Sequence, residues 1–242
     1  MRALRELLRN RAAREREGVF VAEGRHLLRA AIEHEAPVLR CYVREGEVID
    51  LPAGLEVRRL ARGVAERIGD AVTSQGIFTV VRRVPAGADT LLRSDLSLVA
   101  ASLADPGNLG TLMRSGAAAG ATALGLGPGS VDAYNPKVVR ASAGACFTVA
   151  TLEGVPAVEM LEALGAHGVH RLGAVVAGGR APESVDLTVP CTFVLGHETR
   201  GLDHGLPIDD VVTIPMRSGE SLNVAMAATV LLFEAARQRR AA

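Results

Sequence analysis

Arg114 is a cation in a segment that otherwise consists of small and apolar residues. It follows Met113, precedes the small residues 115–119, and lies six residues after Asn108. Asn108 follows a turn made by residues 105–107, so we expect it to cap the helix that carries Arg114. We expect the guanidinium to be at least partly buried, and a buried guanidinium requires partners, usually phosphate or carboxylate.

A glycine and a carboxylate directly follow the apolar run "CTFVLG". Gly196 lets a ligand approach the backbone closely, and Glu198 is predicted to lie at the carboxyl edge of a buried strand. His197 beside Glu198 has no third ligand at a suitable spacing. We therefore expect no metal site.

Two polar residues flank Leu222 at the start of the last amphipathic segment. Ser221 is a plausible N-cap for the helix that follows. Asn223 then stands where helix propensity disfavours it and where no second cap is needed. A role outside the helix is therefore indicated for Asn223.

Two further segments resemble phosphate-binding elements. "GLGPGS", residues 125–130, lacks the G-x-G-x-x-G spacing, and Pro128 removes an amide, so we interpret it as a tight turn. Pro136 can open the next helix, on which Lys137 and Arg140 share one face. Structural and phosphate-binding roles remain open for that pair.

The elements that must position these residues alternate regularly after residue 96. Apolar runs such as "LSLVAAS", "ATALGLG", "CFTVA", "RLGAVVA", "CTFVLG" and "VVTIP" are separated by segments with helical spacing. This pattern predicts an α/β fold with a parallel sheet covered by helices on both faces. Ligands bind such sheets at the carboxyl ends of the strands, which is where the residues above are found.

The first third of the chain has a different pattern. "VFVAEG", "VLRCYV" and "GIFTVV" are short β-rich runs, while residues 2–17, "GRHLLRAAIEH" and "ARGVAERIGD" have helical spacing. The Pro- and Gly-containing segment 84–96 reads as a linker. We expect a small α/β domain at 1–83 and a larger domain at 97–242.

Composition excludes several classes of protein. Apolar runs are too short to span a membrane, and the charged first residues do not resemble a signal peptide. Cys41, Cys146 and Cys191 are widely spaced in apolar sequence, as expected for buried, reduced thiols of a cytoplasmic protein.

The charge is unevenly distributed although the formal net charge is zero. Residues 1–83 contain 16 Arg against 12 Asp and Glu, a net of +4, which leaves −4 for the remainder. A basic first domain is compatible with RNA binding. Solvent-exposed helix faces in an arginine-rich chain explain the uneven charge equally well.

Together, three segments resemble the signature motifs of the SpoU (TrmH-like) family of SPOUT-class RNA ribose 2'-O-methyltransferases. The motifs are N-x-G-x-x-x-R, G-x-E-x-x-G-L and I-P-M followed by S-L-N-V. They correspond to Asn108, Gly110 and Arg114; to Gly196, Glu198, Gly201 and Leu202; and to residues 214–216 and 221–224. The first domain is similar to the substrate-binding domain of many members.

The resemblance implies a fold, a methyl donor and an assembly. The catalytic domain is expected to contain a deep trefoil knot and to bind S-adenosylmethionine, without a metal, and two copies are expected to complete each active site as a homodimer. The donor is expected to contact Leu195, Gly196, Ile214, Met216 and Leu222.

The resemblance also implies catalytic roles. Arg114 is expected to contact the RNA phosphate and the ribose hydroxyl, and Asn108, Glu198, Ser221 and Asn223 are expected to position it and the ribose. Because the pKa of a guanidinium is above about 12, electrostatic activation is preferred to literal proton removal.

Ribosomal RNA of the large subunit (23S) is the favoured substrate of the implied methyl transfer. Transfer RNA is the alternative substrate, and an inactive RNA-binding protein on the same scaffold is the alternative function. A nucleotide-dependent oxidoreductase is disfavoured because the chain lacks a dinucleotide-binding glycine fingerprint.

Overall fold

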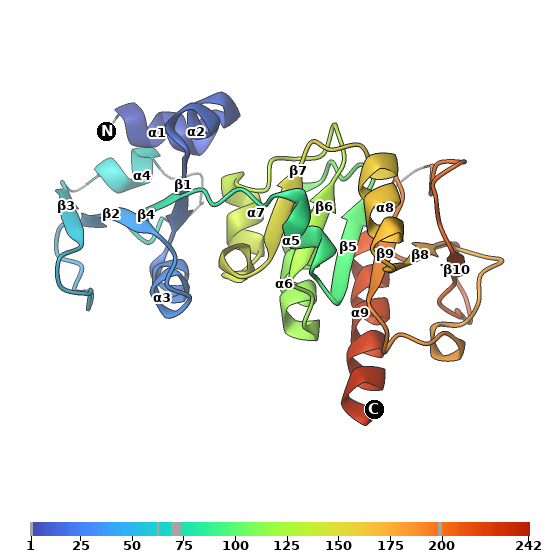
Figure 1. Ribbon diagram of the computed structural model, residues 1–242. Helices are drawn as coiled ribbons and strands as arrows, with labels where there is room; N and C mark the ends of the chain where they lie inside the picture. The colour runs from blue at the N-terminus through green and yellow to red at the C-terminus, as the bar shows by residue number, and fades with distance from the viewer. Residues whose placement is uncertain (1, 62, 69–73, 198–199) are drawn as a thin grey trace.

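A computed structural model of the chain describes residues 2–61, 63–68, 74–197 and 200–242, arranged around two separate β-sheets (Figure 1). The first sheet has four strands in the order β1-β4-β2-β3, and the second has six in the order β10-β8-β9-β5-β6-β7. None of the helices in the described part of the chain is long and apolar enough to cross a membrane.

The first sheet is mixed. β1 and β2 both pair with β4 in antiparallel fashion, whereas β2 and β3 are parallel. Helices α1 and α2 pack on one face, around a cluster that includes Leu4 and Phe78, and α3 packs on the other, around Leu28 and Ile77. The elements are α1 (Arg2–Arg9), α2 (Arg11–Glu17), β1 (Val19–Glu23), α3 (Arg25–Glu33), β2 (Val38–Arg44), β3 (Glu56–Leu60), α4 (Val64–Ile68) and β4 (Ile77–Arg82).

Two details of this domain differ from the sequence prediction. The helical segment 2–17 is interrupted at Asn10, whose side chain accepts a hydrogen bond from the Ala12 amide and so caps α2. Strand β3 was not predicted, because it is an edge strand with four exposed residues and carries charges instead of an apolar run.

All strand pairs of the second sheet are parallel, as the sequence pattern predicted. Helices α6, α7 and α9 cover one face and α5 and α8 the other. The elements are α5 (Ala88–Leu92), β5 (Leu96–Ala100), α6 (Pro106–Ala119), β6 (Ala123–Leu126), α7 (Pro136–Ala141), β7 (Ala150–Glu153), α8 (Ala157–Ala166), β8 (His170–Ala174), β9 (Cys191–Leu195), β10 (Asp210–Val212) and α9 (Val224–Ala241).

The segment assigned as a linker contains the short helix α5. Leu91 of this helix is buried in a cluster with Met160 of α8, so this part of the segment packs against the second sheet. The "GLGPGS" segment forms the expected tight turn, closed by a hydrogen bond from the Ser130 amide to the Gly127 carbonyl at 3.3 Å.

The prediction of a strand at "CFTVA" was wrong for most of its length. Residues Ala145–Phe147 form a 3-10 helix, and strand β7 begins only at Ala150.

Cys41 and Cys191 are buried and Cys146 is partly buried, and all three are free thiols. Burial raises the pKa of Cys146 to about 11, so its thiol stays protonated at neutral pH.

A buried ion pair joins the two domains. Arg14 of α2 donates from Nε and Nη2 to Asp132 Oδ2, at 2.8 and 2.5 Å, and from Nη1 to the Leu7 carbonyl at 2.7 Å. The two charged side chains are only 3% and 4% exposed. Asp132 Oδ1 also accepts the Tyr134 amide, so both carboxylate oxygens are used.

Tyr134 extends this junction. Its ring packs against Phe20 of β1, with the centroids 4.7 Å apart, and the Arg83 guanidinium lies 4.5 Å from its centre. Arg83 also pairs with Glu153 at 3.1 Å, and both side chains are largely buried. Charged, aromatic and apolar contacts therefore hold the two domains in one relative orientation.

We predict that Asp132→Ala lowers the free energy of unfolding by about 3–5 kcal/mol, because it leaves the Arg14 guanidinium buried without its counter-charge. The measurement is denaturant unfolding followed by circular dichroism. The double variant Arg14→Met with Asp132→Asn removes both charges and should lose much less. Equal losses in the two variants would contradict this explanation.

Candidate functional site

A cavity of about 610 Å³ opens at the carboxyl ends of β8, β9 and β10, beside the start of α9. This is the edge where the strand-end rule places a ligand site. Eight of the ten residues assigned from the sequence to catalysis or donor binding line it: Asn108, Leu195, Gly196, Ile214, Met216, Ser221, Leu222 and Asn223. Asn108 and Asn223, which are 115 positions apart in the chain, thus meet at one place.

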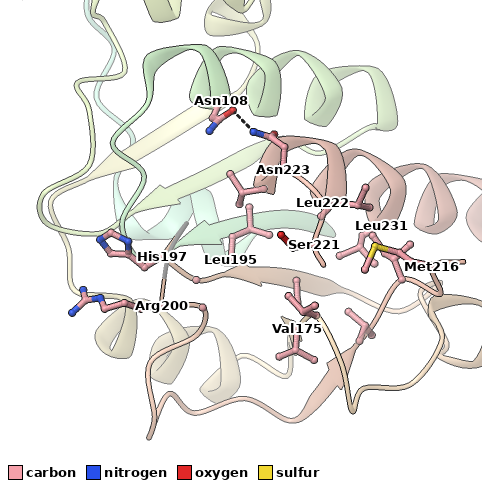
Figure 2. Close-up of a pocket in the computed structure, with 18 residues that line it drawn as sticks. Asn108, Val175, Leu195, His197, Arg200, Met216, Ser221, Leu222, Asn223 and Leu231 are labelled. Carbon is pink, nitrogen blue, oxygen red and sulfur yellow. Dashed lines mark hydrogen bonds between the residues drawn. The ribbon is translucent and has the colours of Figure 1, made fainter. Parts of the chain in front are cut away.

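The cavity has apolar walls and a polar rim (Figure 2). Val175, Leu195, Met216 and Leu231 surround its interior, whereas Asn108 and Asn223 meet along one rim. A cavity of this size, with a few polar groups at one end, suits a small organic ligand that combines a flat apolar ring with polar substituents.

Asn223 has two structural roles that the sequence analysis did not assign. Its Oδ1 accepts hydrogen bonds from the amides of Ala225 and Met226, so Asn223 is the N-cap of α9 and Ser221 is not. Its Nδ2 donates to Asn108 Oδ1 at 2.9 Å (Figure 2). The prediction that Asn223 is unnecessary as a cap was wrong.

Asn108 is not a helix cap either. Asp105 caps α6, its carboxylate accepting from the Asn108 amide at 2.8 Å, and Asn108 already lies inside the helix. The side chain of Asn108 is therefore available to bond Asn223 at the edge of the cavity. A second side-chain bond, from Thr229 to Ser115 at 2.7 Å, ties the same two helices about two turns further along.

Only glycine fits at Gly196, because the backbone of the same loop packs against it. A Cβ atom there would lie 2.2 Å from the backbone carbon of Gly201, far inside van der Waals contact. Reciprocal backbone hydrogen bonds between His197 and Gly201, at 2.8 and 2.9 Å, hold this close approach. The close approach predicted at Gly196 is therefore made by the loop's own backbone. Glu198, the other residue predicted from this segment, lies outside the described residues.

Arg114 does not meet the other predicted residues within one chain. Its side chain is exposed, which corrects the expectation of burial, and it lines a separate groove with His34, Ala117 and Gly144. The structure describes no hydrogen bond or ion pair of Arg114 among residues 2–61, 63–68, 74–197 and 200–242. An exposed cation of this kind is free to bind a partner from outside the chain.

Arg140 has a structural partner, whereas Lys137 is exposed. Arg140 Nη2 donates to Glu23 Oε2 at 3.2 Å, across the junction between the domains. Glu23 is 5% exposed, so Arg140 neutralises a nearly buried carboxylate. The structural interpretation of Arg140 is thus favoured over phosphate binding.

Several cavity residues were missed by the sequence reasoning. Val175 directly follows β8, and the strand-end rule could have found it. His197 and Arg200 lie together at the rim opposite Met216 (Figure 2), within the G-x-E-x-x-G-L motif, at two of the positions that the motif leaves unspecified. Ala227 and Leu231 line the cavity because they follow Asn223 by one and two helical turns.

Two family models together match nearly the whole of this chain. Residues 95–233 match the SpoU rRNA methylase family, and residues 1–79 match the MRM3-like substrate binding domain. The 23S rRNA (guanosine(2553)-2'-O)-methyltransferase RlmP of Bacillus subtilis is 29% identical, over 93% of this chain and 92% of its own.

A methyltransferase sequence and a crystal structure from Streptomyces viridochromogenes are also similar. The 23S rRNA (uridine(2479)-2'-O)-methyltransferase is 33% identical over 96% of this chain and 88% of its own. The SpoU methyltransferase AviRb, whose crystal structure is a complex with the cofactor AdoMet, superimposes with a TM-score of 0.87 at 28% identity, covering 100% of this chain and 98% of that one.

The family resemblance read from the three motifs is therefore confirmed. The family model matches more than half of this chain, and relatives align along nearly all of it. This chain therefore belongs to the SpoU rRNA methylase family.

Proposed function

We propose that this protein transfers a methyl group from S-adenosylmethionine to a ribose 2'-hydroxyl of 23S ribosomal RNA. The observation that carries the proposal is the single cavity in which Asn108, Asn223 and the donor-binding residues of two separate motifs converge. The names of the similar proteins from Bacillus subtilis and Streptomyces viridochromogenes specify this reaction on 23S rRNA.

The cavity fits the methyl donor in size and polarity. Apolar side chains from Val175, Leu195 and Leu231 suit an adenine ring, and the backbone at Leu195–Gly196 and at Ile214–Met216 would hold the donor's polar groups. Leu222 is 42% exposed at the mouth, where it can cover a bound ligand. When bound, S-adenosylmethionine supplies an electrophilic methyl group on a sulfonium centre.

The residues of the chain must then prepare the ribose oxygen. The pKa of a ribose hydroxyl is far above neutral, so attack on the methyl group requires loss of its proton and stabilisation of the developing negative charge. Arg114 supplies a fixed positive charge that stabilises the developing negative charge on the ribose oxygen and binds the adjacent phosphate. Asn108, Ser221, Asn223 and Glu198 orient the ribose.

A homodimer would bring Arg114 to the methyl donor. Within one chain Arg114 faces a different groove from the donor cavity, and we infer that the cation reaches the donor from a second copy. Helix α9 carries an exposed apolar stripe, Met226, Val230 and Phe233, each 44–56% exposed, beside α6. Burying this stripe against its symmetry mate is a physical reason for a two-fold dimer through the catalytic domain.

The domain roles follow from the same proposal. The domain at residues 1–83 binds the RNA, the segment 84–96 connects it, and residues 97–242 catalyse. The free thiols favour the reducing cytoplasm, where ribosomes assemble. The trefoil knot stays a prediction of the family resemblance.

The direct test is to incubate the purified protein with S-adenosylmethionine and an unmodified 23S rRNA transcript, then to map 2'-O-methyl groups by mass spectrometry. One methylated ribose is expected. Methylation of transfer RNA alone would replace the proposed substrate, and absence of methyl transfer to either RNA would overturn the function.

We predict that Arg114→Ala lowers the rate of methyl transfer by about 100-fold or more, as the loss of one preorganised charge does in other active sites. The affinity for S-adenosylmethionine, measured by calorimetry, should be unchanged because Arg114 does not line the donor cavity. Arg93→Ala is the control, because Arg93 is also exposed but lies after α5 on the opposite face of the sheet. Equal rates for the two variants would contradict the role of Arg114.

Mixing two inactive variants tests the shared active site. Ala227→Trp fills the donor cavity, so it should be inactive, as Arg114→Ala should be. After mixing and exchange of subunits, heterodimers contain one intact site, and about a quarter of the wild-type activity should return if a closed two-fold dimer forms. No recovery, with heterodimers demonstrated by differential tagging, would show that each chain uses its own Arg114.

A further inference from the structure

A second cavity, of about 790 Å³, lies within the N-terminal domain between α3 and residues 49–52. All of its lining residues fall in the segment that matches a substrate-binding domain, yet none has a role in the donor site. Leu28, Ile32, Ile49 and Leu51 form its apolar wall. Its location indicates that it serves the recognition of substrate.

The rim of this cavity is polar and mainly basic. Arg25, His26 and Arg29 line it from α3, with Asp50 and Gln75 opposite. A wall of aliphatic side chains accepts the face of a nucleobase, amide and carboxylate groups can bond its edge, and guanidinium groups bind phosphate. This combination matches a nucleotide better than it matches an apolar peptide or a free anion.

The walls of the cavity are held in place before any ligand binds. Arg25 donates through Nη1 to the Val48 carbonyl at 3.0 Å and pairs through Nη2 with Glu47 at 3.2 Å. Its backbone amide donates to Gln75 Oε1 at 3.0 Å, which supplies the cap that Gly24 lacks. Preformed walls reduce the entropy that a bound nucleotide would otherwise cost.

The cavity is connected to Arg114 across the domain junction. His26, on its rim, contacts the Ala143 carbonyl through Nε2 at 3.1 Å. Ala143 lines the groove of about 490 Å³ that also contains His34 and Arg114. Among the described residues that line this groove, none is acidic. Figure 1 places α3 and α6 on the same side of the molecule, so one strand of RNA can contact both.

We propose that the cavity between α3 and residues 49–52 holds one unpaired nucleotide of the RNA substrate, and that the strand runs from it past His26 to Arg114. The proposal rests on the proposed function, since it assigns a specificity site to the same RNA. The protein would thus recognise its target by a base held at a fixed distance from the methylated ribose, because the ion pairs of the junction set that distance.

Arg29→Glu is the principal test. Arg29 is 68% exposed and, among the residues that the structure describes, pairs only with Glu33 at the surface, so its replacement should leave the fold intact. Loss of a phosphate contact and reversal of charge should raise the Kd for the 23S rRNA transcript, measured by filter binding, about tenfold or more and reduce its salt dependence. The affinity for S-adenosylmethionine should not change.

Arg16→Glu is the matched control. Arg16 is 59% exposed, pairs with two glutamates, and lies on α2, on the opposite face of the same sheet. Its substitution changes the domain's charge equally, so a general electrostatic effect would weaken RNA binding in both variants. Equal Kd values for the two variants would overturn the nucleotide site.

Crosslinking provides a second measurement on the unaltered protein. A 23S rRNA transcript containing 4-thiouridine, irradiated in complex with the full chain, should crosslink to peptides that contain residues 25–32 or 49–52. Crosslinks confined to other peptides would overturn the site while leaving the function intact. Failure of the wild-type protein to methylate the transcript would instead overturn the function.

Discussion

The side chain of Asn223 makes the hydrogen bonds on which the cavity beside α9 depends. Its oxygen caps α9 and its nitrogen bonds Asn108 on α6, so one amide fixes the start of one helix against the first turn of another. Both helices cover the same face of the parallel sheet, and the cavity opens where their N-termini meet the strand ends. An aspartate would keep the cap but lose the donated hydrogen bond, and a serine is too short to serve both partners.

A different constraint governs the RNA side of the protein. Two buried or largely buried ion pairs, Arg14 with Asp132 and Arg83 with Glu153, cross between the domains together with the Tyr134 ring. Charges that have lost their hydration are stable only while their partners remain in place, so the junction resists hinge motion. Under the proposed nucleotide site, a rigid junction would fix the distance between the bound nucleotide and the reacting ribose.

The cavity beside α9 and Arg114 are separated in the monomer, and under the proposed dimer this separation gives the exposed residues of α9 a role. Met226, Val230 and Phe233 are unfavourable on an isolated surface, and the proposed dimer would bury them. On this interpretation methyl transfer depends on assembly, because neither chain holds the donor and the activating cation at one place.

The sequence by itself determined the alternation of elements, the parallel sheet and the family, because apolar periodicity and motif spacing are local properties of the chain. It could not determine which polar residue caps each helix, because Asn108 and Ser221 are residue types as suitable for an N-cap as Asp105 and Asn223, the residues that cap α6 and α9. Strand β3 and the strand predicted at "CFTVA" were misjudged because edge exposure and local turns override composition. Only the tertiary structure placed Arg114 away from the cavity beside α9. The sheet and α9 cover one face of α6, and the side chains on its other face, Arg114 among them, point elsewhere.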